Sequence, residues 1–330
     1  MSARMPSSFA ARRFAGLAAL AAGVPVFGGC RGALAPAAES SERIAILFWI
    51  MAGAAAAIWI AVLLLATYAR YRRRPPRRRV AMALIVIGGA VVPVLGTAAL
   101  VVGSLPMLPW LHAPHEGLQI RIEAERWWWR VHYRHDGRII ESANELRLPA
   151  GEPVTLLLGS RDVIHSLWIP ELAGKLDMIP GRETRLLLRP ARSGRFDGLC
   201  AEYCGSSHAH MRFTTVVMPR PRFDTWLARQ ATPRAPASSD DDGARAFLSR
   251  GCGGCHRVRG SAADGRIGPD LTHLASRHTL AAGTLPMTRR DLERWIARPQ
   301  HYKPGALMPA YDMLEPAERR AIAAWLLEDT

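Results

Sequence analysis

Two long apolar stretches stand out near the start of the chain, and they differ from everything that follows. Residues 44–69 and 80–103 carry no charged side chain. Each stretch is longer than the roughly 20 apolar residues that a helix needs to cross a bilayer core. The pattern therefore predicts a transmembrane helical hairpin over residues 44–103.

The region 116–230 has short runs of alternating or β-rich residues instead. Glycine and proline separate these runs, which is typical of the strands of a sandwich or barrel. The clearest runs are residues 119–123, 154–158, 184–188 and 213–217. Loops at one end of such a scaffold are held rigidly enough to carry binding residues. Residues 221–230 are expected to form a helix that ends this all-β domain.

Residues 231–242 are rich in Ala, Pro, Ser and Asp, which is the composition of a linker. After it, the apolar spacing changes to a period near 3.6 residues, most clearly at 290–297 and 316–327. We expect an all-α domain over residues 243–330. The predicted fold class is thus a multidomain membrane protein with a helical hairpin, an all-β domain and an all-α domain.

The formal net charge of +15 raises the question of nucleic-acid binding, but the position of the charge answers it. Seven arginines lie within residues 69–79, between the two apolar stretches. Arginine between two spans marks the cytoplasmic side of a membrane. Both termini and both later domains are then outside the cytoplasm. Outside the Trp127–Trp129 cluster, no basic stretch alternates with aromatic residues, so we expect no nucleic-acid partner.

Residues 1–30 have the layout of a signal peptide. Arg12 and Arg13 precede an apolar run at 14–26. The run ends in Gly-Gly-Cys30, which is similar to a bacterial lipoprotein cleavage site, where the cysteine becomes lipidated. Phe27 is a less usual residue in such a site, and a signal peptide cut elsewhere, or left uncut, is the alternative.

The all-α domain opens with Cys252-x-x-Cys255-His256, the attachment signal for haem c. Both thiols would form thioethers with the haem, and His256 would bind the iron. A redox dithiol and half of a zinc ribbon are the alternatives. No second cysteine pair follows to complete a zinc site, and no strand–helix alternation typical of thioredoxins surrounds the motif.

The second iron ligand is expected in a later loop, and Met308 is the preferred candidate. It lies in Lys303-Pro-Gly-x-x-Met308-Pro, where prolines stiffen the chain. Methionine opposite histidine raises a haem potential, as electron carriers need. This segment and Gly268-Pro-Asp-Leu271 resemble small bacterial cytochromes c. The other candidates are Met287, Met313, His273, His278 and His301.

The all-β domain contains a second ligand set, Cys200-x-Glu202-x-Cys204-x-x-x-His208-x-x-Met211. Thiolate, imidazole and thioether ligands suit copper or zinc. Structural zinc would require four strong Cys or His ligands, and this loop offers three with a weak thioether, which favours copper. A disulfide beside an unrelated histidine is the alternative.

Together with Asp162-Val-Ile-His165-Ser, this loop resembles the binuclear copper-A site of cytochrome c oxidase subunit II. The resemblance implies a cupredoxin-like domain in which Cys200 and Cys204 bridge two copper ions. His165 and His208 would each bind one copper ion.

The same resemblance assigns further residues. Met211 would be a weak ligand of one copper ion, and the main-chain carbonyl of Glu202 would bind the other. The Glu202 carboxylate would reach a magnesium ion at the boundary with oxidase subunit I, which the segment 175–182 would also contact. Trp127 would be the residue through which electrons reach the copper pair.

The resemblance implies an electron-input subunit of a terminal cytochrome c oxidase in a bacterial inner membrane. Its partners would be subunit I, subunit III, and an external cytochrome c or other one-electron donor. Oxygen reduction and proton pumping would occur in subunit I. A flexible linker would raise the effective concentration of the fused cytochrome to the order of millimolar.

Two alternatives remain open at this point. The family usually has a glutamate near the cytoplasmic start of the second span, whereas this chain has no carboxylate between Arg43 and Glu116. That departure leaves room for the electron-input subunit of a haem–copper nitric oxide reductase. A stand-alone, membrane-tethered electron carrier is the other alternative.

Overall fold

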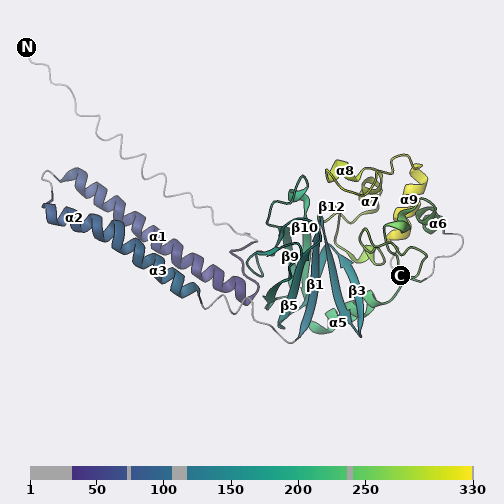
Figure 1. The fold of residues 1–330 in the computed structure, drawn as a ribbon, viewed down its shortest axis with the longest axis horizontal. Helices are drawn as coiled ribbons and strands as arrows, with labels where there is room; N and C mark the ends of the chain where they lie inside the picture. Colours follow the sequence, from purple (N-terminus) through teal and green to yellow (C-terminus); the bar gives the residue numbers. More distant parts are fainter. Residues whose placement is uncertain (1–31, 73–75, 106–116, 236–240, 329–330) are drawn as a thin grey trace, which may run out of the picture.

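The computed structural model describes residues 32–72, 76–105, 117–235 and 241–328. The predicted signal peptide and Cys30 lie outside the described residues, as do 73–75 of the arginine loop and 236–240 of the predicted linker. Figure 1 shows a helical hairpin on one side of a β-sandwich and a mainly helical domain on the other side. The predicted fold class is therefore confirmed.

Two long helical segments lie side by side in Figure 1 and form the hairpin. The first is α1, Glu39–Tyr71. The second runs through α2 (Arg78–Val86), a π-helical turn η1 (Ile87–Val91) and α3 (Val92–Ser104). Most of their apolar side chains are exposed, and both segments are long and apolar enough to cross a membrane.

The π-helical turn has a local cause in the sequence. Pro93 has no N–H and cannot donate to the carbonyl of Gly89, four residues earlier. Widened turns of this kind accommodate such breaks inside a longer helix. The second segment therefore continues to Ser104 rather than ending at the proline.

The start of α1 is attached to the sandwich rather than free. Ser40 and Ser41 are each 2 % exposed. The Ser40 hydroxyl donates to the Leu172 carbonyl at 2.7 Å, and the Ser41 hydroxyl donates to the Glu171 carbonyl at 2.6 Å. These two bonds fix the direction in which the hairpin leaves the β-domain.

The sandwich consists of two five-stranded sheets. In order, the first contains β3 (Arg138–Ala143), β2 (Trp128–His135), β1 (Leu118–Glu125), β5 (Val154–Ser160) and β8 (Thr184–Leu188). The second contains β4 (Glu145–Pro149), β10 (Arg212–Met218), β9 (Gly194–Cys200), β6 (His165–Trp168) and β7 (Leu176–Met178). The pairs β1–β5 and β4–β10 are parallel, and all the other pairs are antiparallel.

The core of the sandwich is made by alternate side chains of these strands. Its fully buried members include Ile120, Ile122, Leu146, Leu148, Leu156 and Leu158. Each stabilises the fold by roughly 1.5–3 kcal/mol relative to an exposed position. A Cβ on Gly198 would lie 2.2 Å from the Phe213 ring, so glycine is needed where β9 meets β10. Helix α5, Arg220–Ala231, packs Trp226 edge-on against Tyr133.

The last domain is built from short helices around one apolar core. Its helices are α6 (Asp242–Ser249), η3 (Cys252–Gly254), η4 (Leu274–Ser276), α7 (Arg289–Ala297), α8 (Pro299–Tyr302) and α9 (Pro316–Leu326). Phe247 and Trp325 join α6 to α9 with ring centroids 5.1 Å apart. A small hairpin, β11 (Thr279–Leu280) and β12 (Leu285–Pro286), is an addition to the all-α prediction.

Buried charges hold the helical domain against the sandwich. Arg130 on β2 is 1 % exposed and pairs with Glu125 and Glu141. Its guanidinium also donates to the carbonyls of Arg266 and Ile267 at 3.1 and 3.3 Å. One buried cation of the sandwich thus satisfies two main-chain acceptors of the helical domain.

Glu145 on β4 makes a second such contact. The main-chain N–H and Nδ1 of His278 donate to one carboxylate oxygen at 3.0 and 2.7 Å, and Arg147 donates to the other. Burial would raise the pKa of Glu145, but these hydrogen bonds and the Arg147 charge outweigh it and hold the pKa below its usual range. The helical domain is therefore docked through specific contacts, which a flexible tether alone would not provide.

We expect Glu145→Ala to lower the free energy of unfolding by about 1–3 kcal/mol, because it leaves buried donors of Arg147 and His278 without their acceptor. Denaturant titration of the detergent-solubilised chain measures this. Because the folded-state pKa is lowered, the contribution is present above the ordinary glutamate pKa and is lost as the pH falls through the lowered value. The matched control is Glu152→Ala. The Glu152 side chain is 39 % exposed and pairs with Arg220 at the surface. An equal loss in both variants would contradict the prediction.

Candidate copper and haem sites

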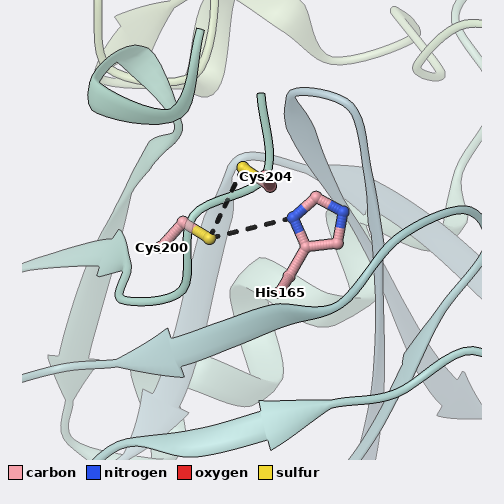
Figure 2. A group of neighbouring side chains, drawn as sticks. All are labelled: His165, Cys200 and Cys204. Carbon is pink, nitrogen blue, oxygen red and sulfur yellow. Dashed lines mark hydrogen bonds between the residues drawn. The ribbon is translucent and has the colours of Figure 1, made fainter. Parts of the chain in front are cut away.

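Three predicted copper ligands come together at one end of the second sheet, as Figure 2 shows. His165 is the first residue of β6 and Cys200 is the last residue of the neighbouring β9. The two thiol sulfurs are 3.8 Å apart, and His165 Nδ1 lies 3.8 Å from Cys200 Sγ. All three side chains are buried, and their ligand atoms lie within 4.8 Å of one another. The disulfide alternative does not hold, because Cys200 and Cys204 are free.

The other three predicted ligands surround the same two sulfurs. His208 Nδ1 is 3.5 Å and Met211 Sδ is 3.9 Å from Cys204 Sγ. The main-chain oxygen of Glu202 is 3.2 Å from Cys200 Sγ. Two thiols, two imidazoles, a thioether and a carbonyl therefore converge on one buried spot. This donor set fits a soft metal centre with bridging sulfur.

The ring of His165 is oriented from behind by Asp162. Its Nε2–H donates to Asp162 Oδ1 at 2.8 Å, which leaves Nδ1 facing the sulfurs. Burial opposes ionisation of Asp162, but hydrogen bonds from His165, Arg126 N–H and Val163 N–H hold its pKa below the usual range. Such carboxylate–histidine pairs commonly orient metal ligands. We had not predicted a role for Asp162, although its place three residues before the histidine was the available signal.

The two thiols differ in how readily each loses its proton. The hydrogen bond with Cys204 lowers the pKa of Cys200, and the same interaction, with burial, raises the pKa of Cys204. One thiolate therefore forms readily, and a bound metal would have to displace the second proton. The coupling is a consequence of placing two sulfurs 3.8 Å apart in a buried loop.

The Glu202 side chain lies apart from the sulfurs. Its carboxylate is 3.9 Å from Lys175 Nζ, and both side chains are about half exposed. The predicted magnesium site there stays a prediction.

Trp127 lies in the turn between β1 and β2. Trp127 and Trp129 are buried, at 8 % and 1 % exposure, and Trp128 between them is half-buried. The Trp127 indole N–H donates to the Cys204 carbonyl at 3.0 Å. Trp127 is thus attached directly to the loop that carries both thiols.

A cavity of about 290 Å³ lies where the helical domain meets the sandwich. Cys252, Cys255, His256 and Met308 all line it. Most of the remaining wall is apolar and includes Leu271, Leu280, Ile296, Leu307, Tyr311 and Ile322. On the sandwich side the wall is formed by Trp127 and Trp128 together with Glu125, Arg126, Asn144 and Asp162. An apolar cavity with two free thiols, an imidazole and a thioether fits a covalently attached haem.

His256 is held in the state that iron binding requires. Its Nδ1–H donates to the Pro269 carbonyl at 2.9 Å, so Nε2 is the nitrogen left to bind a metal. Burial lowers the pKa of His256, which keeps the ring neutral. A neutral imidazole is the form that ligates metals.

The structure separates Met308 from the other candidates for the second iron ligand. Among the six candidates, only Met308 lines the cavity. Gln300 Nε2 donates to its carbonyl at 2.6 Å and thereby braces the loop. Met313 is 73 % exposed, and His278 is engaged by Glu145.

Comparison with known proteins gives a family match over each of the two regions that contain these residues. Residues 130–218 match the family described as cytochrome c oxidase subunit II, periplasmic domain. Residues 241–329 match the cytochrome c family. The chain thus joins a region similar to a subunit II periplasmic domain to a region similar to cytochrome c.

Curated relatives of this chain are named cytochrome c oxidase subunit 2. Cytochrome c oxidase subunit 2 of Alkalihalophilus pseudofirmus is 34 % identical over 209 residues, which is 63 % of this chain and 60 % of that protein. The Bacillus subtilis protein of the same name is 31 % identical over 223 residues, 64 % of this chain and 62 % of that protein. The match thus spans about three-fifths of the length of these relatives.

Two further similarities come from Bradyrhizobium. Alternative cytochrome c oxidase subunit 2 of Bradyrhizobium diazoefficiens is 44 % identical over 97 residues, 29 % of this chain and 35 % of that protein. Among solved structures, the periplasmic domain of subunit II of cytochrome oxidase (CoxB) of Bradyrhizobium japonicum is 27 % identical. That similarity covers 36 % of this chain and 96 % of the other, with a TM-score of 0.34.

Substitution of two neighbouring histidines, His208 and His210, tests whether His208 is a copper ligand. We expect His208→Ala to lower the copper content and to remove the visible and near-infrared copper absorption, because Nδ1 faces Cys204 Sγ. His210→Ala is the matched control, since His210 is exposed in the same helical turn η2, His208–His210. Metal analysis and absorption spectra of the purified chain give the answer. Equal copper loss in both variants would remove His208 from the ligand set.

Cys204→Ser tests the bridging thiolate separately. We expect it to abolish the near-infrared copper absorption while the haem absorption stays intact, because the haem cavity is lined by other cysteines. Retention of the copper band after this substitution would refute the assignment.

Substitution of two methionines in the helical domain, Met308 and Met313, tests whether Met308 is the second iron ligand. Met308→Ala is expected to lower the haem reduction potential, because methionine opposite histidine raises it. Met313→Ala, at a position that is 73 % exposed, is the control and should leave the potential unchanged. Redox titration followed by haem absorbance measures both. An unchanged reduction potential in Met308→Ala would show that another candidate is the second iron ligand.

Proposed function

We propose that this chain is the electron-input subunit of a haem–copper terminal oxidase, passing electrons from haem c to a binuclear copper-A centre and on to subunit I. The observation that carries the proposal is the position of Trp127. It lines the haem cavity on one side and donates to the Cys204 carbonyl on the other. A single buried side chain therefore spans the gap between the two sites.

The residues divide into two sets by their roles. In the cytochrome domain, Cys252 and Cys255 would attach the haem, and His256 and Met308 would bind its iron. In the sandwich, Cys200 and Cys204 would bridge two copper ions. The remaining copper ligands would be His165, His208, Met211 and the carbonyl of Glu202. When bound, haem c and copper would supply one-electron redox chemistry, with no proton required from the protein.

The protein matrix contributes rigidity to this transfer. Asp162 holds His165, Pro269 holds His256, and Gln300 holds the Met308 loop. Ligands fixed in this way need little movement when an electron arrives or leaves. Preorganised donors of this kind are what fast electron transfer between metal centres requires.

An exposed apolar surface beside the copper loop supports contact with subunit I. Tyr203, between Glu202 and Cys204, is 76 % exposed, and Ile164, next to His165, is 45 % exposed. Large exposed apolar side chains gathered in one place commonly mark a protein interface. Lys175 and Glu202 would complete this face, where magnesium would bind. Subunit III is expected in the same assembly.

The face for the external donor would lie on the cytochrome domain instead. Ile267 and Leu307 line the haem cavity and are 69 % and 86 % exposed. Trp127 is covered by the cytochrome domain, so an external cytochrome c or other one-electron donor would reach the haem before the copper. The hairpin would place both domains on the outer side of a bacterial inner membrane, with the arginine-rich tip in the cytoplasm.

The absence of a carboxylate between Arg43 and Glu116 favours one second candidate, the electron-input subunit of a nitric oxide reductase. The two differ in the reaction of the partner subunit. A stand-alone electron carrier would have no such partner.

Purification of the intact membrane complex separates these functions. We expect subunit I to copurify, with haem a absorption and oxygen uptake driven by reduced cytochrome c. Haem b with turnover of nitric oxide would support the reductase instead. Recovery of this chain without a large partner subunit would contradict both and leave the stand-alone carrier.

A further inference from the structure

Lysine is rare in this chain, and both lysines occupy notable positions. Of the 43 basic residues, only Lys175 and Lys303 are lysines. Lys175 lies on the exposed face beside Glu202. Lys303 is 4 % exposed and lies between the two metal-binding domains. A chain that uses arginine almost everywhere else has a lysine at this buried interdomain position.

The ammonium group of Lys303 joins the domains through main-chain oxygens. It donates to the carbonyl of Trp127 in the sandwich and, at 3.1 Å, to that of Ala281 in the cytochrome domain. Within the described parts of the chain, no carboxylate lies within ion-pair distance of it. Lys303 therefore acts as a hydrogen-bonded clamp rather than as one half of a salt bridge.

The loop that follows Lys303 packs on the same tryptophan. The Ser207 hydroxyl donates to the Pro304 carbonyl at 2.6 Å, next to the copper ligand His208. Gly305 has a φ of +82°, and a Cβ there would lie 2.7 Å from Trp127 Cη2. The chain from Lys303 to Gly305 thus approaches both the main chain and the ring edge of Trp127, and it leads directly to Met308.

Burial explains why the position suits lysine better than arginine. Desolvation lowers the pKa of Lys303 to about 7, so the amine can be either protonated or neutral near neutral pH. An arginine guanidinium cannot deprotonate in proteins, and its planar fork needs more room and more acceptors. A lysine amine can donate to two carbonyls in either protonation state.

From these contacts we propose that Lys303 is a positioning residue for electron transfer from haem c to copper. It clamps Trp127 in the wall of the haem cavity while the Trp127 indole holds the Cys204 carbonyl. The inference rests on the proposed function, since it concerns the path between the two centres. With both groups bound, the haem held by Cys252, Cys255 and His256 would give up one electron, and the copper held by Cys200 and Cys204 would gain it.

Lys303→Met tests the clamp, because it keeps the length of the side chain and removes the donors. In the full chain loaded with haem c and copper, a photoreductant injects one electron into the haem, and absorbance follows its arrival at copper. We expect transfer to slow by several-fold, because Trp127 loses the donor that fixes its carbonyl in the wall of the haem cavity. The control is Arg320→Met, which removes an exposed cation from the same domain and should leave the rate unchanged.

A double substitution asks whether Lys303 acts through Trp127. If it does, Lys303→Met should slow transfer further by less than two-fold in a chain that already carries Trp127→Phe, because coupled residues are not additive. Fully multiplicative effects would show that Lys303 acts elsewhere and would overturn the inference. Ser207→Ala is a milder variant that loosens the same loop, and it should slow transfer in the same direction if Lys303→Met does not assemble.

A second readout does not depend on the transfer rate. Hydrogen exchange of the full chain with haem c and copper bound, read by mass spectrometry, should be faster around residues 124–130 in Lys303→Met than in the unsubstituted chain and in Arg320→Met. Unchanged exchange and an unchanged transfer rate would overturn the clamp.

The outcomes for the proposed function and for this inference differ. Absence of haem-to-copper transfer in the unsubstituted chain would count against the proposed function. Normal transfer there, with the same rate in Lys303→Met, would count against the role of Lys303 alone.

Discussion

The hydrogen bonds of one buried tryptophan set the relation between the two metal-binding domains. Trp127 offers two polar groups to a largely dry junction, and each has a partner. Its indole N–H binds the Cys204 carbonyl, and its main-chain carbonyl accepts from Lys303. An unsatisfied group in such a place would cost about 1–3 kcal/mol. The copper loop, the turn before β2 and the Met308 loop are therefore constrained together.

Buried charged side chains make the orientation of the two domains at this junction specific. Arg130 and Glu145 lie on the sandwich, yet they bind main-chain or side-chain groups of the cytochrome domain. Burying a charge is costly unless its partners are placed well, so alternative docked arrangements would leave these groups unpaired. The orientation in which the domains meet gives Arg130 and Glu145 their partners across the junction. Loss of orientation would also open the apolar haem cavity, which both domains enclose.

The opposite side of the sandwich shows the same principle with smaller groups. Ser40 and Ser41 attach the first turn of α1 to carbonyls near β6 and β7. The sandwich thus has the helical hairpin on one side and the cytochrome domain on the other, as Figure 1 shows. The copper loop is bonded to Trp127 and to the Pro304 carbonyl, so its position relative to the haem cavity is determined by short hydrogen bonds rather than by the linker.

The sequence by itself predicted most of the elements and proposed the candidate ligands. Uncharged apolar length predicts the hairpin, two-residue alternation predicts strands, and Cys, His and Met spacing predicts the two metal sites, because each of these signals is local in the chain. The tertiary structure alone decided the partners that come from far away. Asp162 behind His165 was close enough in sequence to be noticed, whereas Lys303 contacts Trp127 across a separation of 176 residues. Nothing local in the chain encodes such a contact, because it depends on how two finished domains bury their charges against each other.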